Sequence, residues 1–344
     1  MVKVGIVGDG YTAVELVRIL KGHPEVAVTA VTSIEHVGHY LHDIYPALMG
    51  YYTQPLIKTE LDILQQECEV VFLALPHGQS MAMVPELLQA GIKCIDLGAD
   101  FRLKDAIAYR SFYEHEHQAP ELLAEAVYGI PELNREFIRG ARLVANPGCY
   151  PTGAIMALTP LLRAGLLEPQ RLIVDSKSGV SGAGRGLKTS SLFCEINEGV
   201  GPYGVGTHRH RPEMIQECSA AAGEPVNLMF TPHLVPMNRG ILTTAYGWLR
   251  SGTIAEIGEA YRDIYSNEHF INLLPPGVYP HTKRVYGSNR VEIGWWLDAS
   301  SGQVVMMSAI DNLCRGASGQ AVQNLNLMCG LPETMGIDLP PVWP

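Results

Sequence analysis

The sequence predicts an α/β protein in which a doubly wound parallel sheet is followed by an α+β domain with a mixed sheet. In the first part of the chain, short apolar strands alternate with helical segments. These strands are expected at residues 2–7, 26–32, 70–75, 93–97 and 143–145. In the last part, strands at 226–249, 291–297 and 304–310 are separated by one helix, at 253–265. We therefore expect a first domain of residues 1–148 with the C-terminal region 315–344, and a second domain of residues 149–314.

A glycine-rich turn follows the first strand. Residues 8–13 read Gly-Asp-Gly-Tyr-Thr-Ala, which fits the pattern G-x-G-x-x-A, and a helix with an apolar face comes next. Such glycines let the backbone approach a pyrophosphate that faces the helix N-terminus, which is typical of a Rossmann-type dinucleotide-binding turn. The alternative is an ordinary tight turn. The residues expected at the cofactor are Gly8, Gly10, Tyr11, Thr12 and Ala13.

The second strand ends where the adenosine ribose of a dinucleotide should lie. Ser33 could hydrogen-bond a 2′-phosphate, which would favour NADP, whereas Glu35 could accept from a 2′-hydroxyl, which would favour NAD. No arginine stands at this position to hold a phosphate. The residues alone leave the choice between the two cofactors open.

Further along, Arg102 follows the strand at 93–97 and is a candidate fork for a phosphate or carboxylate at the carboxyl edge of the sheet. Residues 109–139 are acidic and are predicted to be rich in loops, with an ordered turn at 128–132. The C-terminal segment 318–329 is predicted to be a helix whose apolar face docks on a core, which we expect to be that of the first domain.

Cys149 lies between a predicted strand and a predicted helix. The strand at 143–145 stops at Asn146-Pro147, Gly148 permits a sharp turn, and helical spacing of apolar residues begins at Thr152. Backbone N–H groups and the helix dipole favour a thiolate at this position. We therefore interpret Cys149 as a nucleophile; the alternative is a buried, inert thiol.

A second loop of small residues and cations follows the strand expected at 172–176. Residues 177–185 read Lys-Ser-Gly-Val-Ser-Gly-Ala-Gly-Arg. They form either a flexible hinge or an anion-binding loop lying over the cofactor, and the second reading is favoured beside a nucleotide domain. The candidate residues here are Ser178, Gly179, Ser181 and Gly182.

The segment 208–213, His-Arg-His-Arg-Pro-Glu, is the second chemical focus. Pro212 and Glu213 suit the first turn of a helix, so His210 stands at a helix start, where the dipole helps to keep it neutral and able to accept a proton. Glu213 could orient its ring. A zinc site of Cys149, His208 and His210 is a weaker alternative because paired ligand motifs are absent. A cysteine protease would leave the glycine turn without a use.

The composition limits the class of protein. A formal net charge of −10 argues against general binding to nucleic acid or anionic membranes, although a local basic pocket remains open. Seven cysteines without CxxC pairs fit reduced thiols, the N-terminus runs straight into a strand, and no apolar stretch reaches the length of a membrane span. We expect a soluble, cytoplasmic protein.

With these motifs, the chain resembles the N-acetyl-gamma-glutamyl-phosphate reductase family of arginine biosynthesis, and more loosely the aspartate-semialdehyde dehydrogenases. The resemblance runs almost end to end. It is carried by five motifs in order: residues 146–152, 178–185, 208–213, 230–237, and 311–313 through 320–324.

The resemblance implies an NADP-dependent reductase that forms a thioester on Cys149 and releases phosphate and a semialdehyde. It implies that the His210 region supplies the acid/base, with His208 as an alternative or a substrate contact, and that Asn312 approaches the nicotinamide. The residues that would hold the substrate are Arg102, Asn146, Ser178 and His208. Ile34 departs from the family, whose members often carry arginine after this serine.

The partners expected are a small acyl phosphate and further copies of the chain, as a dimer or tetramer, and no metal. Two rivals to this function remain open. One is a related reductase for aminoadipyl or aspartyl phosphate. The other is a non-catalytic dinucleotide-binding regulator, against which the Cys149 and His210 motifs argue.

Overall fold

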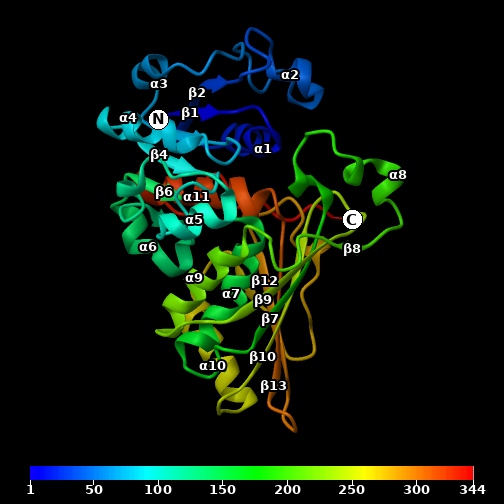
Figure 1. Ribbon diagram of the computed structural model, residues 1–344. Coiled ribbons are helices and arrows are strands. Elements are labelled where there is room, and N and C mark those ends of the chain that lie inside the picture. The colour runs from blue at the N-terminus through cyan, green and yellow to red at the C-terminus, as the bar shows by residue number, and fades with distance from the viewer. Residues whose placement is uncertain (344) are drawn as a thin grey trace. The chain divides into compact units, whose positions relative to one another are not determined.

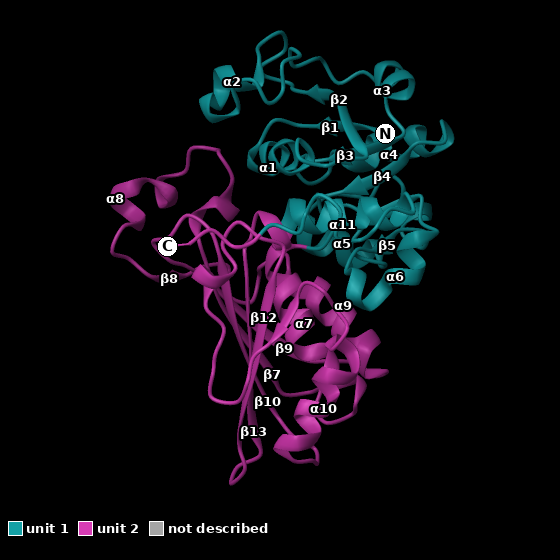
Figure 2. Cartoon of the chain, turned by 180° about the vertical axis from the view of Figure 1, so that it is seen from behind, with its two compact units in different colours: residues 1–147, 317–339 teal, residues 148–316, 340–344 magenta. Residues whose placement is uncertain are grey.

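The computed structural model describes residues 1–343 and divides into two compact units (Figure 2). Unit 1 comprises Met1–Pro147 and Ala317–Leu339, and unit 2 comprises Gly148–Gly316 and the segment from Pro340 onward. This last segment was expected in the first domain. It belongs to unit 2 because the Val342 N–H donates to the Tyr286 carbonyl at 2.9 Å and the Lys283 ammonium lies 4.6 Å from the centre of the Trp343 ring.

Unit 1 is built on a six-stranded sheet in the order β2-β1-β3-β4-β6-β5, and every neighbouring pair is parallel (Figure 1). This order is that of a doubly wound sheet, as predicted. Its strands are β1 (Val2–Val7), β2 (Val26–Thr32), β3 (Val70–Leu73), β4 (Lys93–Asp96), β5 (Val127–Tyr128) and β6 (Leu143–Ala145). Its helices are α1 (Tyr11–Leu20), α2 (Leu41–Ile44), α3 (Leu61–Glu67), α4 (Ser80–Gln89), α5 (Ala106–Tyr113), α6 (Pro131–Arg139) and α11 (Gly319–Met328).

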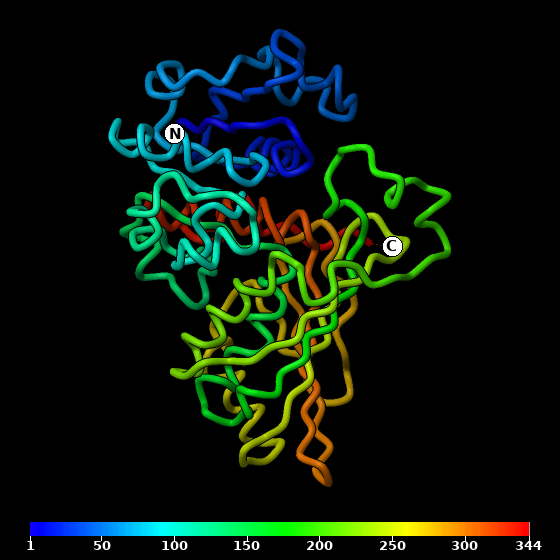
Figure 3. The backbone as a smooth tube through the Cα atoms, in the orientation of Figure 1, coloured from blue at the N-terminus to red at the C-terminus, as the bar shows by residue number. Residues whose placement is uncertain are grey.

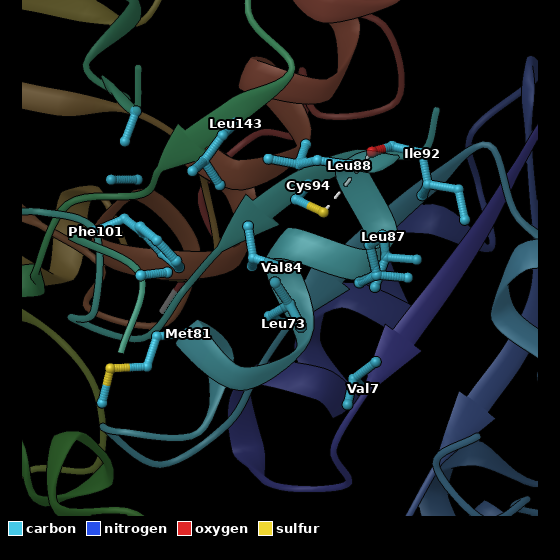
Figure 4. Packing of buried hydrophobic residues seen from close by; sticks show 14 of the residues in the cluster. Val7, Leu73, Met81, Val84, Leu87, Leu88, Ile92, Cys94, Phe101 and Leu143 are labelled. Atoms are coloured by element: carbon cyan, nitrogen blue, oxygen red, sulfur yellow. Dashed lines mark hydrogen bonds between the residues drawn. The ribbon is translucent and has the colours of Figure 1, made fainter. Parts of the chain in front are cut away.

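The strands of unit 1 are mostly apolar because helices cover the sheet. All four residues of β3 are buried, and Leu73 packs in one cluster with Val84 and Leu87 of α4 (Figure 4). Val7 at the end of β1 and Leu143 at the start of β6 belong to the same cluster. A strand buried on both faces has no polar alternation, which is why the sequence pattern of continuous apolar runs identified these strands.

The segment 109–139 was wrongly predicted to be rich in loops, since it contains most of α5 and all of α6. The side chain of Asp105 caps α5 by accepting from the Ile107 N–H at 2.8 Å, and Pro131 stands in the first turn of α6. Both helices are short and largely polar on the outside, so composition concealed them.

The last helix, α11, completes unit 1. All ten of its residues are buried. The Asn324 side chain donates to the Gly129 carbonyl at 3.0 Å, and Ser318, which precedes the helix, donates to the Thr12 carbonyl at 2.9 Å. In Figure 3 its orange-red trace runs beside the cyan and green trace of this unit. The expectation that the C-terminal helix docks on the first domain is therefore confirmed for residues 317–339.

Unit 2 holds a seven-stranded mixed sheet in the order β11-β12-β13-β10-β7-β9-β8. The pairs β7–β9 and β11–β12 are parallel and the other pairs are antiparallel. The strands are β7 (Leu172–Ser178), β8 (Gly201–Pro202), β9 (Leu228–Leu234), β10 (Ile241–Trp248), β11 (Ile271–Leu273), β12 (Val291–Asp298) and β13 (Gln303–Ile310). The helices are α7 (Cys149–Arg163), α8 (Phe193–Ile196), α9 (Arg211–Ala222) and α10 (Ile254–Tyr265). The predicted α+β domain with a mixed sheet is confirmed.

Helix α7 lies at the centre of unit 2. It begins at Cys149 itself, three residues before the expected start. The Ser308 hydroxyl of β13 donates to the Gly153 carbonyl at 2.8 Å. A Cβ on Gly153 would lie 2.9 Å from the Ser308 hydroxyl oxygen. On the other side, Tyr265 of α10 donates to the Met156 carbonyl at 2.9 Å. The helix is thus fixed closely between the sheet and α10.

Within residues 1–343, no helix is both long enough and apolar enough to cross a bilayer.

Candidate functional site

The glycine-rich turn of unit 1 is shaped to receive a phosphate group. Gly8 has a φ of +114°, and a Cβ there would lie 2.5 Å from the Ala74 carbonyl oxygen, so only glycine fits. Gly10, the N-cap of α1, meets no atom within 4 Å of the position a Cβ would take. The protein itself therefore does not require glycine at position 10, whereas a closely approaching ligand would. Tyr11 and Thr12 supply the first N–H groups of α1, and Ala13 is buried behind them. The turn fits a dinucleotide.

A hydrogen-bonded group that the sequence analysis missed lies at the end of β2. Ser33 is buried, and its hydroxyl donates to Asp9 Oδ2 at 2.9 Å. The Nδ1 atom of His36 approaches the same carboxylate oxygen at 2.6 Å, and the His36 N–H donates to Ser33 Oγ at 2.9 Å. Glu35, the acid expected here, is exposed. The signal in the sequence was the carboxylate inside the glycine-rich turn.

Arg102 and Asn146 are brought together at the carboxyl edge of the parallel sheet. Arg102 is buried, and its guanidinium donates to the Asn146 carbonyl at 2.8 Å and to the Leu97 carbonyl at 3.0 Å. The Asn146 side chain donates to the Ala317 carbonyl at 3.1 Å and accepts from Asn324 Nδ2 at 3.1 Å. Both residues thus fix the loops after β4 and β6, and their contact with a substrate stays a prediction.

Two buried acids that were not anticipated lie beside Arg102. Burial, with the nearby Asp100 carboxylate, raises the pKa of Asp96 to about 7. The Ser80 hydroxyl and the Gly98 N–H donate to Asp96 Oδ1 at 2.7 and 2.9 Å, which opposes that rise. Asp100 accepts from the Gly78 N–H at 2.7 Å and from the Tyr109 hydroxyl at 2.9 Å.

In unit 2, Cys149 is the first residue of α7 and is partly exposed. The Gly148 N–H, immediately before it, donates to Oε1 of the buried Glu213 at 2.8 Å. On another side, a Cβ on Gly316 would lie 2.9 Å from Cys149 Cβ. Glu213 therefore braces the turn that carries the cysteine, and its expected role in orienting the His210 ring stays a prediction. Gly316 was missed because its closeness to Cys149 arises only in the folded chain.

Aromatic rings surround His208 and His210. The His208 ring centre lies 4.9 Å from that of His210 and 5.5 Å from those of Tyr150 and Tyr203. Phe230 lies 5.3 Å away. Burial, with help from the Arg209 charge, lowers the pKa of His208 to about 4, so its ring is neutral at pH 7. Its Nδ1 accepts from the His210 N–H at 3.1 Å, which places the ring proton on Nε2.

Tyr150 and Tyr203 connect these rings to the cysteine. Tyr150 follows Cys149 in α7, and its hydroxyl is 2.8 Å from that of Tyr203. Burial, together with the neighbouring Cys149, raises the pKa of Tyr203 to about 12. Cys149, Tyr150, Tyr203 and the two histidines therefore form one group, of which Tyr203 was not predicted.

The loop after β7 is braced, not hinge-like. A Cβ on Gly179 would lie 2.7 Å from the Asn238 carbonyl oxygen, and the Gly179 N–H donates to the Gly240 carbonyl at 2.9 Å. The Asn312 amide donates to Ser181 Oγ at 2.9 Å and accepts from the Gly240 N–H at 2.7 Å. The structure therefore brings together the loop residues Ser178, Gly179, Ser181 and Gly182 with Asn312.

Across residues 1–343, no group of three or more His, Cys, Asp or Glu side chains is placed to hold a metal ion.

Comparison with known proteins agrees with both units. Residues 3–141 match the family described as semialdehyde dehydrogenase, NAD binding domain, and residues 149–312 match semialdehyde dehydrogenase, dimerisation domain. The chain is 51% identical over 346 residues to the N-acetyl-gamma-glutamyl-phosphate reductase of Moorella thermoacetica, covering 100% of both chains. The enzymes of that name from Citrifermentans bemidjiense and Geobacter sulfurreducens are 53% and 52% identical, with 100% and 98% of both chains covered.

The chain belongs to the N-acetyl-gamma-glutamyl-phosphate reductase family.

Solved structures show the same fold at low identity. Aspartate semialdehyde dehydrogenase II of Vibrio cholerae superposes with a TM-score of 0.73 at 18% identity, covering 96% of this chain and 98% of that one. The aspartate semialdehyde dehydrogenase of Candida albicans, solved with NADP, gives a TM-score of 0.66 at 14% identity, with 96% and 98% covered. The fold prediction is thus confirmed, and this reductase carries a nicotinamide dinucleotide-binding domain.

Proposed function

We propose that this chain reduces N-acetyl-gamma-glutamyl phosphate to N-acetyl-L-glutamate 5-semialdehyde and phosphate, in arginine biosynthesis. The observation that carries the proposal is the position of Cys149 as the first residue of α7, held by Glu213 through Gly148 and grouped with His208 and His210. The N-terminal end of a helix stabilises a thiolate, the form of cysteine that attacks carbonyl carbons.

The first step is acyl transfer to sulfur. The Cys149 thiolate attacks the acyl carbon, the carbon–oxygen bond to phosphate breaks, and a thioester remains on the enzyme. Backbone N–H groups at the start of α7 stabilise the oxyanion of the tetrahedral intermediate. When bound, the reduced nicotinamide dinucleotide supplies the hydride that reduces the thioester carbonyl. The resulting thiohemiacetal releases the aldehyde and regenerates the Cys149 thiolate.

His210 is the residue we assign to proton transfer. It is the N-cap of α9, beside the aromatic group that includes Tyr150 (ring centres 5.9 Å apart). His208, whose pKa is lowered to about 4, is too weak a base to hold a proton at neutral pH and instead presents its Nε2–H to the site. We assign the substrate contacts to Ser178, His208, Arg102 and Asn146. Asn312 is assigned to the nicotinamide. Of the two dinucleotides, the family resemblance implies NADP.

The outer face of the unit 2 sheet supports a homo-oligomer. Ile173, Met229, Tyr246 and Trp296 are 39–49% exposed and project from four strands. They lie in one row across the sheet, because Met229 pairs with Ile173, Ile173 with Tyr246, and both Tyr246 and Trp296 with Val305. A continuous apolar row on a sheet is suited to a partner surface. We propose that two copies pair through it.

The test is the reverse reaction, with N-acetylglutamate semialdehyde, phosphate and either NADP or NAD, followed by the absorbance of the reduced cofactor. With this aldehyde, we expect reduction of the nicotinamide cofactor that depends on phosphate. Activity with aspartate semialdehyde instead would assign a sister specificity. Absence of turnover with every aldehyde, while dinucleotide still binds, would favour the non-catalytic regulator.

A further inference from the structure

A carboxylate from the glycine-rich turn, that of Asp9, lies at the end of β2, where the adenosine ribose of a dinucleotide is expected. In dinucleotide-binding domains, the residue that reads the ribose 2′ position ordinarily follows the second strand. Here that residue is Ser33, and its hydroxyl donates to Asp9, which comes from the turn between β1 and α1. Asp9 therefore brings a carboxylate to the end of β2, where a ribose-binding acid would otherwise stand.

Ser33 cannot serve a 2′-phosphate as a donor in this arrangement. A serine hydroxyl has a single hydrogen, and that hydrogen is directed to Asp9 Oδ2 at 2.9 Å. The Ser33 side chain is also buried and accepts from the His36 N–H. The Ser33 hydroxyl, which in the sequence favoured NADP, is thus already hydrogen-bonded to Asp9.

Strong cations are lacking at the same place. Residues 8–13 and 32–43 contain no lysine or arginine. Lys58, in the segment beside the end of β2, is exposed and lies 3.4 Å from Glu60. The basic side chains that residues 32–43 do contain are those of His36, on Asp9, His39, whose ring centre is 6.2 Å from that of His36, and His42. A 2′-phosphate would therefore meet a carboxylate before it met a permanent positive charge.

We propose that Asp9 selects the cofactor of this chain, accepting the ribose hydroxyls of NAD and disfavouring the 2′-phosphate of NADP. The inference rests on the proposed dinucleotide role of the turn, and it departs from the NADP dependence that the family resemblance implies. Ser33 and His36 hold the Asp9 carboxylate in position, which limits its ability to move away from a phosphate.

The experiment measures binding of NADH and NADPH to the full chain without substrate, by fluorescence titration at pH 8. Wild type should bind NADH at least about 10-fold more tightly, as expected when a carboxylate faces a phosphate. Asp9→Asn keeps the size and an acceptor for Ser33, and should reduce that preference by about 10-fold, through tighter NADPH binding.

Tighter binding of NADPH by wild type, or an unchanged preference in Asp9→Asn, would overturn the proposal. Glu35→Gln removes the same charge from the exposed neighbour and should leave the preference within about 2-fold, as is typical of a solvated charge. A larger shift in Glu35→Gln would assign selection to Glu35 instead. Because no substrate is present, these results are independent of which acyl phosphate the enzyme uses.

Discussion

Glu213 Oε1 accepts a hydrogen bond of 2.8 Å from the backbone N–H of Gly148, the residue before Cys149. A buried carboxylate on α9 thereby fixes the turn from which the nucleophile projects. The turn has no side-chain cap of its own, since the N-cap of α7 is a glycine. Glu213, on α9, accepts a backbone N–H at the start of α7, which is the role that a capping side chain within the turn would have.

Removing this carboxylate should misplace Cys149. We expect Glu213→Ala to lower kcat by about 10- to 100-fold, the equivalent of one lost charged hydrogen bond. Glu213→Gln retains an acceptor and should lose less. The rate of Cys149 alkylation by iodoacetamide should fall in the same order, while KM changes little. Equal losses in both variants would instead assign Glu213 a role as a charge near the reaction.

Cys149→Ser should abolish turnover, because a hydroxyl in this position is scarcely ionised and forms no thioester. Dinucleotide binding, measured by fluorescence, should be preserved. Cys194→Ser is the control, since Cys194 is exposed on α8. Single-turnover release of phosphate would report the acylation step directly. Ordinary activity in Cys149→Ser would exclude the covalent mechanism.

Gly316→Ala should impair catalysis, because the new methyl group would lie 2.9 Å from Cys149 Cβ and push the start of α7 away. A loss of about 1–3 kcal/mol in stability is expected from overpacking at this site. Gly140→Ala is the control, because a Cβ there meets nothing within 4 Å and the residue has a φ of −92°. Thermal unfolding and kcat of the two variants should separate clearly.

His208 should make stability depend on acid pH. Its pKa in the folded chain is about 4, below the usual 6.5, so the unfolded chain binds more protons between these values. The free energy of unfolding should therefore fall as pH drops from about 6.5 towards 4. Urea unfolding at pH 7 and pH 5 should show a smaller fall for His208→Gln than for wild type. An equal fall in the free energy of unfolding for wild type and His208→Gln would mean that His208 remains solvated.

Asp96 acts in the opposite direction. Its raised pKa, about 7 in the folded chain, means that the folded state binds the extra proton, so stability should decline as pH rises from about 4 to 7. Asp96→Asn cannot ionise and should be more stable than wild type at pH 8, by up to about 4 kcal/mol. At pH 4.5 the two should be similar. Urea unfolding at both pH values measures the difference, and a destabilised variant at pH 8 would show that the ionised form is preferred.

The α/β class, the glycine-rich turn and the importance of Cys149 and the 208–213 motif could be predicted from the sequence. These features are local: a buried parallel strand reads as an apolar run, and a strand–turn–helix junction is carried by a few consecutive residues. The same local reasoning missed α5, which depends on the cap of Asp105, and set the start of α7 too late.

The contacts that the side chains make arise only in the folded chain. Glu213 and Gly148 are 65 residues apart in the sequence, and Ser33 and Asp9 are 24 apart. Gly316, which is also distant in sequence, is packed against Cys149 at the start of α7. Hydrogen bonds and close packing depend on distances of a few ångströms between elements, which no periodicity or spacing along the chain encodes. For this reason the candidate nucleophile could be identified from the sequence, but the groups that position it could not.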